Sequence, residues 1–215
     1  MKKYLLLIVL FAITGCMTIS YKPVANPDQR IIFEGFSFLP PNGENWEVTS
    51  DPLEINGTFE TWGRSTIKMK GFKKSIIGPN QEVGEAEQWK VSISKYEFGV
   101  MKFDHDDDLI EFAQYGLKSL GKQGMLLLES SHSHETFQGM NCVRTEAKIE
   151  GGRKISSSKL SAVIIYTQGY TCVHPKFPEH LVTLGAERSV LKGQTPTEFQ
   201  SEVDPFFNSL KVHEQ

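Results

Sequence analysis

The chain of 215 residues has only three cysteines, no excess of positive charge and no apolar run long enough to cross a membrane. Its formal charge is -3. Binding of nucleic-acid phosphates needs clustered lysine and arginine, so no nucleic-acid partner is expected. The apolar stretch Tyr4–Ile13 spans about 15 Å as a helix, half of a ~30 Å hydrocarbon core. It is therefore not a transmembrane helix.

Signatures of common enzymes are also missing. The chain has no GxSxG nucleophile elbow, no P-loop and no dinucleotide-binding glycine pattern. Ser92 with Lys95 and Ser156 with Lys159 match the Ser-x-x-Lys element of penicillin-binding enzymes, but the companion Ser-Asp-Asn and Lys-Thr-Gly elements are absent. We interpret both pairs as chance matches.

A specific pattern is present at the N-terminus. Two lysines precede the apolar stretch and Ile13-Thr14-Gly15-Cys16 ends it, which is the layout of a secretory signal. The ending resembles the lipobox of bacterial lipoproteins, in which the cysteine sulfur is acylated and the chain is cut just before that cysteine. The resemblance implies a signal peptide over residues 1–15 and a lipidated Cys16. The alternative is a buried N-terminal strand with an ordinary cysteine, which the Met-Lys-Lys start disfavours.

Acylation would make the membrane a partner of the protein. Each buried methylene contributes ~0.8 kcal/mol to membrane residence, and two acyl chains make attachment lasting. By the same resemblance, Met17 in place of Asp after the cysteine favours the outer membrane, on its periplasmic face, in a Gram-negative cell. Loss of Lys2 and Lys3 with the signal changes the formal charge from -3 to -5.

The rest of the chain predicts one α+β domain. Residues 16–30 contain two prolines and no periodicity, so they are expected to form a flexible tether, and residues 31–215 form the domain. Extended patterns cover residues 31–39, 46–48, 64–72, 89–94, 126–132, 140–149, 159–167 and 181–189. Helices are expected over residues 104–120 and from a capping box at Thr195, with Pro205 inside the second helix. This order predicts an antiparallel sheet covered by two helices.

The chain resembles a known fold at this level. The segment FSFLPPNGENW at residues 36–46 and the closing segments AERSV and FFNSLKV resemble the PsbP-like fold, which also occurs in Ran-binding Mog proteins. Residues 139–142 and 169–175 look like an uncharacterised family of bacterial lipoproteins that shares this fold. Because members of the fold mostly bind or assemble with partners, the resemblance implies a binding module rather than an activity.

The acidic cluster Asp104–Asp108 is the first candidate for a metal site. It does not fit a calcium loop, because the sixth position is Leu109 instead of glycine and the twelfth is Tyr115 instead of glutamate. Acidic residues at a helix N-terminus cap free amides and meet the positive end of the dipole. We therefore interpret the cluster as a helix start.

Histidines are the second candidate. His132 and His134 lie on one side of an extended segment, and imidazole is the commonest transition-metal ligand. A zinc site needs three or four protein ligands, and no sequence argument brings His174 to this pair. No metal and no other cofactor is expected. An envelope hydrolase built from His132, His134, His174 and the cluster Asp104–Asp108 is the alternative function.

Large aromatic side chains and one arginine complete the candidates. The tryptophans and tyrosines are expected in the core, since they supply large apolar area in a sheet. Arg188 would share a strand face with Val182 and Leu184. Its buried charge would need a partner, which predicts a structural ion pair.

A disulfide between Cys142 and Cys172 follows from cysteine count and compartment. With Cys16 lipidated these two cysteines remain, and exported proteins meet oxidising machinery. The bridge should contribute roughly 3 to 4 kcal/mol in the loop-entropy model. Strict alternation places Cys142 on the polar face of Arg144 and Glu146, so we expect a partly exposed bond or a β-bulge. Two free buried thiols are the alternative.

Together these features predict a membrane-anchored periplasmic lipoprotein. Its domain would act as a non-catalytic binding or assembly module for an envelope protein or a small ligand.

The first testable expectation concerns the anchor. Replacement Cys16→Ser should abolish acylation and leave the precursor uncut, because the sulfur is the acyl acceptor. Intact mass of the protein purified from membranes measures both effects, with Cys142→Ser as the control that keeps the anchor. A mature chain that starts elsewhere, or that carries no acyl mass, would contradict the lipobox interpretation.

Overall fold

The computed structural model describes residues 19–77, 85–99, 101–103, 105–118, 120–154 and 160–213. The signal peptide, Cys16, Asp104 and the pair Ser156 and Lys159 lie outside these residues. No helix in the described part of the chain is both long and apolar enough to cross a membrane.

The described residues form mainly strands, with two α-helices and one 3-10 helix. The strands are β1 (Tyr21–Pro23), β2 (Ile31–Phe33), β3 (Phe36–Phe38), β4 (Glu47–Thr49), β5 (Leu53–Phe59), β6 (Gly63–Ile76), β7 (Glu87–Phe98), β8 (Leu126–Phe137), β9 (Met140–Lys154), β10 (Leu160–Val173), β11 (His180–Leu191) and β12 (Lys211–Val212). The helices are α1 (Asp106–Lys118), the 3-10 helix η2 (Leu120–Gln123) and α2 (Gln200–Asn208).

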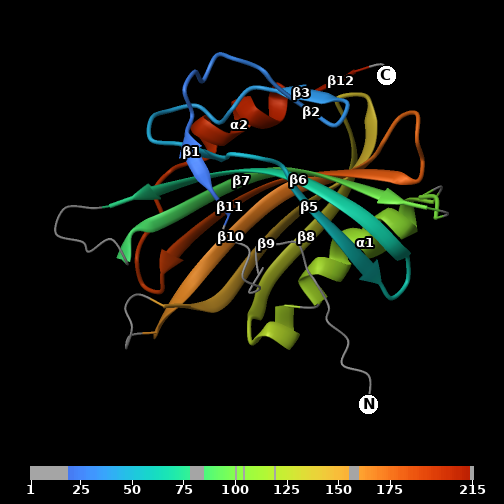
Figure 1. Cartoon of the computed structure of the whole chain (residues 1–215). Helices are drawn as coiled ribbons and strands as arrows, with labels where there is room; N and C mark the ends of the chain where they lie inside the picture. The colour runs from blue at the N-terminus through green and yellow to red at the C-terminus, as the bar shows by residue number, and fades with distance from the viewer. Residues whose placement is uncertain are drawn as a thin grey trace.

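Nine strands form one large antiparallel sheet. Its order is β1-β4-β6-β7-β11-β10-β9-β8, with β5 paired to β6, and a small sheet has the order β12-β3-β2. Figure 1 shows the large sheet curving between two covers, with α2 and the small sheet on one side and α1 on the other. We call these sides the α2 face and the α1 face.

Both faces of the large sheet carry apolar side chains. Along β7, Trp89, Val91 and Ile93 belong to one buried cluster, whereas Tyr96 and Phe98 belong to another. Successive strand residues point to opposite sides, so the first group lies on the α2 face and the second on the α1 face. The sheet is therefore buried on both sides in this region.

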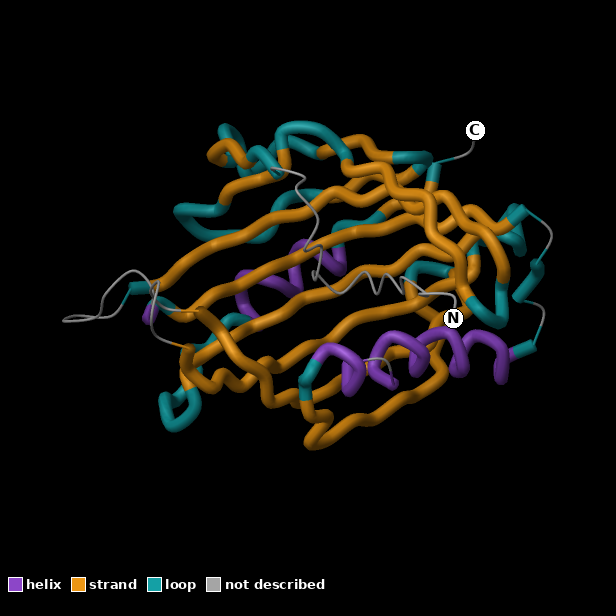
Figure 2. Tube along the Cα trace, turned by 60° about the horizontal axis from the view of Figure 1, so that its bottom comes forward, coloured by secondary structure: helices purple, strands orange, loops and turns teal. Residues whose placement is uncertain are grey.

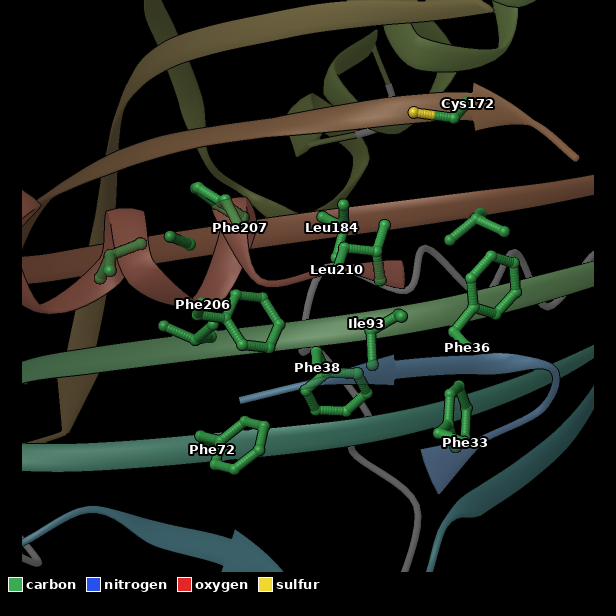
Figure 3. Packing of buried hydrophobic residues seen from close by; sticks show 14 of the residues in the cluster. Phe33, Phe36, Phe38, Phe72, Ile93, Cys172, Leu184, Phe206, Phe207 and Leu210 are labelled. Carbon is green, nitrogen blue, oxygen red and sulfur yellow. The ribbon is translucent and has the colours of Figure 1, made fainter. Parts of the chain in front are cut away.

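Aromatic side chains fill the α2 face. Phe38 of β3, Phe72 of β6 and Phe206 of α2 meet with ring centroids 5.3 to 6.2 Å apart. Figure 3 shows these rings together with Ile93 and Leu184, which come from the large sheet. Edge contacts of this kind add to the apolar area that each ring buries.

The expected fold, a PsbP-like α+β arrangement with a sheet covered by two helices, is wrong. The structure is mostly antiparallel β, because β6, β9 and β10 extend over 14, 15 and 14 residues while α1 and α2 have only 13 and 9. The strand β5 is an additional element that the sequence analysis did not predict. Much of the cover on the α2 face comes from the small sheet rather than from a helix.

Helix α2 begins later than the sequence predicts, which makes it shorter than expected. The helix begins at Gln200, with Phe199 as an N-cap that makes no side-chain hydrogen bond, so the capping box expected at Thr195 is wrong. Glu198 Oε1 instead accepts the Gln200 N–H at 2.6 Å. Phe199 is buried against Trp89 with centroids 5.3 Å apart. Burial of this ring holds the preceding residues out of the helix.

The tether expected over residues 16–30 is shorter in the structure. Tyr21–Pro23 pairs with β4 in the large sheet, and the Val24 N–H donates to the Trp46 carbonyl at 2.9 Å. Lys73 Nζ lies 4.1 Å from the centre of the Tyr21 ring. Pairing satisfies backbone groups that a free segment would leave to water, so the sheet begins at Tyr21.

Glu202 of α2 connects the helix to the large sheet and to the Pro-Pro-Asn-Gly turn. Its Oε2 lies 2.7 Å from Lys74 Nζ and accepts the Trp46 indole N–H at 2.9 Å. The Asn42 N–H donates to the Glu202 carbonyl at 2.9 Å. Gly43 has φ +91°, and a Cβ there would lie 2.5 Å from the Glu202 carboxylate. The turn therefore has a structural role, which is to fit closely around this carboxylate.

This contact predicts a difference between two glycines. Gly43→Ala and Gly63→Ala should each lose about 1 kcal/mol, because both positions have positive φ. Gly43→Ala should lose a further ~1 to 2 kcal/mol, because its methyl must displace the carboxylate from Lys74, whereas nothing lies within 4 Å at Gly63. Urea unfolding measures both, and equal losses would contradict the role of Glu202.

Candidate binding site: a cavity beneath helix α1

A cavity of about 130 Å³ lies between α1 and the large sheet. Figure 2 shows α1 lying along this face of the sheet. The volume is similar to the ~150 Å³ of an engineered apolar cavity that binds benzene. The floor is formed by small polar residues of β7, β9, β10 and β11, among them Ser92, Ser94, Thr145, Thr171 and Thr183. A single ring or a short acyl chain fits such a space.

Helix α1 forms the roof of this cavity. Its buried residues are Leu109, Phe112 and Leu117, and the acidic residues of its first turn meet the positive end of the helix dipole. Ala113 and Gly116 line the cavity from the same helix. Because these two side chains are small, the helix packs on the sheet through its larger residues and leaves space between them.

Small residues also form a row across the sheet on the α1 face. Strand register places Gly71, Ser92, Gly185, Gly169 and Thr145 beside one another on β6, β7, β11, β10 and β9. A Cβ at Gly169 would lie only 2.2 Å from the Leu184 carbonyl oxygen. Glycine is therefore required at that position, and three residues of the row, Ser92, Gly169 and Thr145, line the cavity.

Three tyrosines border the cavity, Tyr96, Tyr115 and Tyr170. Burial raises the pKa of Tyr96 to about 12, despite a hydrogen bond to Thr183, so its hydroxyl stays neutral. The ring of Tyr115 packs at 5.2 Å against Trp62. Its hydroxyl oxygen is buried and makes no hydrogen bond within the described residues. A buried hydroxyl without a partner carries a free-energy cost that a bound polar atom would remove.

The histidines expected on one side of a strand are found on β8. His132 Nδ1 lies 3.1 Å from Thr145 Oγ1, and burial together with Lys118 lowers the pKa of His132. His134 lies opposite Val143. Thr145 lines the cavity, whereas His132 does not. His132 therefore contacts the cavity only through Thr145.

His174 lies elsewhere, beyond the end of β10. Its Nδ1 accepts the N–H groups of Lys176 and Phe177 at 3.2 and 3.3 Å, and its ring lies 5.5 Å from Phe36. Burial, with the charges of His180 and Lys95, lowers the pKa of His174 to about 4. His174 therefore stabilises the turn that follows β10 through these two hydrogen bonds.

The remaining site candidates do not assemble into a reactive centre in the described part of the chain. Asp106 Oδ1 accepts the Asn141 amide at 2.9 Å at the start of α1. No group of three or more His, Cys, Asp or Glu residues able to hold a metal occurs among the described residues. Ser92 and Lys95, three positions apart on β7, point to opposite faces of the sheet. They cannot act as a serine–lysine pair.

Cys142 and Cys172 are joined by a disulfide with an S–S distance of 2.06 Å. The two residues lie directly opposite each other on β9 and β10, and both are 0% exposed. The expected β-bulge or exposed face is therefore wrong. Phe36 and Met140 belong to the same buried cluster at this end of the strands, and the polar residues Arg144 onward lie past the covered part of the face.

Among the described residues Arg188 forms no ion pair, so the pair expected for it is also wrong. Its guanidinium carbon lies 4.9 Å from the centre of the Tyr166 ring and 4.8 Å from that of Phe199. Its Nη1 donates to the carbonyl of Thr197. Two aromatic faces thus replace the carboxylate, which is a favourable setting for a planar cation.

The cavity residues are not apparent from the sequence pattern. Ser92 and Ser94 alternate with Val91 and Ile93, which indicates a strand with one buried and one solvated face. In the structure Ser94 is only 3% exposed, because α1 and Phe112 cover that face. The small residues that form the cavity floor face one another on neighbouring strands. This arrangement could not be recognised without the strand register.

Comparisons with known proteins find little. No family model and no curated protein matches the chain. Among solved structures, the chain is similar to the crystal structure of LpqN, described as involved in cell envelope biogenesis of Mycobacterium tuberculosis. The two are 11% identical with a TM-score of 0.41, over 92% of this chain and 93% of LpqN. At this score the likeness supports no functional inference, and the lipoprotein family named above stays a prediction.

The low pKa of His174 predicts how stability depends on pH. Unfolded histidine takes up a proton near pH 6.5, whereas folded His174 does so only at about 4. Stability is therefore full above pH 6.5 and falls as the pH decreases toward 4, by at most about 1.4 kcal/mol per pH unit for one proton.

His174→Asn tests this dependence, because the amide oxygen can still accept the two backbone N–H groups. Between pH 6.5 and 4 the variant should lose less stability than the native protein, as measured by urea unfolding at several pH values. His180 remains in both proteins and serves as the common background. Parallel curves would contradict the assignment to His174.

Proposed function

We propose that this protein is an exported, lipid-anchored component of the cell envelope whose folded part is a non-catalytic binding module for a small ligand. The anchor is the lipidated Cys16, which attaches the protein to the periplasmic face of the outer membrane. The binding site is the cavity beneath α1.

The observation that carries this proposal is the composition of the cavity. Phe59, Phe112 and Leu117 supply apolar walls, while the floor consists of serine and threonine hydroxyls. Apolar walls with a few placed polar groups are typical of small-molecule sites. Tyr115, whose hydroxyl is buried without a hydrogen bond in the described residues, also lines this cavity.

Larger hollows on the surface are less suited to a small apolar ligand. One of about 620 Å³ is lined by Glu129, Lys148 and Glu198, and another of about 800 Å³ by Arg64, Glu97 and Glu179. These charged residues prefer water to an apolar surface. The cavity beneath α1 is smaller but offers the apolar contact that small-molecule affinity requires.

The hydrolase alternative is less well supported. It needs a nucleophile, a base and a group that orients the base. Thr145 and His132 are in hydrogen-bond contact, yet within the described residues no carboxylate is hydrogen-bonded to His132. His174 is engaged in its own turn.

Filling the cavity tests the proposal. Toluene should bind the native protein, raising its melting temperature in a concentration-dependent way. Ala113→Leu adds three carbon atoms inside the cavity and should weaken toluene binding at least about tenfold, which corresponds to ~1.4 kcal/mol.

Glu111→Leu is the matched control, because it places the same side chain on the exposed side of the same helix. It should leave toluene affinity unchanged. Titration calorimetry with both variants decides the matter. Absence of binding to the native protein, or equal binding by the two variants, would contradict a ligand site under α1.

A further inference from the structure

A second cavity, of about 170 Å³, adjoins the first on the α1 face. Thr167 lines both cavities. The second has apolar walls from Leu120, Met125 and Ile165, and one charged residue of β9, Arg153. We call it the Arg153 cavity.

The charged end of Arg153 is enclosed by the protein. The residue as a whole is half-buried, yet its Nε, Nη1 and Nη2 atoms are all buried and make no hydrogen bond within the described residues. Arginines at a surface normally do the opposite, burying the stem and leaving the guanidinium in water. The fold therefore withholds this cation from solvent without pairing it.

Other charges around the cavity do not compensate Arg153. Glu187 lines the same cavity, but its Oε1 lies 3.1 Å from Lys90 Nζ, so this carboxylate already has a cation. Burial alone lowers the pKa of Arg153, with no carboxylate acting in the other direction. An unpaired buried cation is costly, and a bound anion would remove that cost.

We infer that the Arg153 cavity binds a carboxylate, so that the ligand is a small apolar molecule with one carboxyl group and its apolar body lies in the cavity beneath α1. A carboxylate matches the planar donor set of a guanidinium and can accept two parallel hydrogen bonds. The inference rests on the proposed function and names the class of ligand for the same site.

A pair of probes that differ only in the head group tests this inference. Decanoate and 1-decanol share a chain that is longer than a single ring, which is needed because the two cavities meet only at Thr167, and only the first is an anion at pH 7. The native protein should bind the acid at least tenfold more tightly than the alcohol, as measured by titration calorimetry at low salt. In Arg153→Met the two affinities should become equal, with that of the alcohol unchanged.

Arg144→Met is the matched control. Arg144 is on the same strand and the substitution changes the charge equally, but it lies on the opposite face and pairs with Glu146 at 2.7 Å. It should keep the preference for the acid. Loss of the preference in this control would mean that overall charge decides, which overturns the inference.

Stability of the free protein gives a second readout. Because the unpaired guanidinium costs free energy, Arg153→Met should melt at the same or a higher temperature than the native protein. A lower melting temperature together with an unchanged acid preference would overturn the inference and assign Arg153 a structural role.

The two proposals fail in different ways. If toluene and the alcohol bind but the acid binds no better, only the carboxylate inference fails. If neither head group binds and toluene does not bind, both the proposed function and this inference fail.

Discussion

A sheet that is apolar on both faces needs a cover on each, and the rest of this structure depends on that constraint. Long strands such as β7 carry Trp89 and Ile93 on one side and Tyr96 and Phe98 on the other. Removing such surfaces from water contributes roughly 25 cal/mol per Å². The chain meets the requirement with few helical residues, by placing α2 and a small sheet on one face and α1 on the other.

The two covers differ in how completely they pack. On the α2 face, phenylalanine rings interlock and Glu202 joins the helix to Lys74 of the sheet at 2.7 Å. On the α1 face, the helix crosses a row of glycine, serine and threonine, and space remains beneath Ala113 and Gly116. Both faces thus hold the fold together, the α1 face through contacts among Phe59, Phe98 and Phe112, but the α1 face also leaves a cavity between helix and sheet. Natural proteins depart from satisfied packing mostly at functional sites.

Buried polar atoms without a hydrogen bond occur on four side chains of the described residues, Tyr115, Arg153, His180 and Arg188, and the first two line the cavities on the α1 face. The hydroxyl of Tyr115 and the guanidinium of Arg153 are both buried and both without a hydrogen bond in the described residues. They line adjoining cavities that share Thr167. The free-energy cost of burying these unpaired groups would be removed by a ligand that supplies the missing acceptor. In the proposed complex, the apolar and the charged ends of that ligand lie in different cavities.

The sequence by itself determined most of the strands, a helix expected over residues 104–120 that the structure places at Asp106–Lys118, and the pairing of Cys142 with Cys172, because each depends on local pattern or on cysteine count. The export signal stays a prediction. The sequence did not determine how far the strands extend, the pairing of Tyr21–Pro23, or the late start of α2, where burial of Phe199 overrides a capping box. The cavity was decided only by the tertiary structure. Its residues are small and unremarkable along the chain, and they become a site only because antiparallel register aligns Ser92, Gly169 and Thr145 beneath a helix.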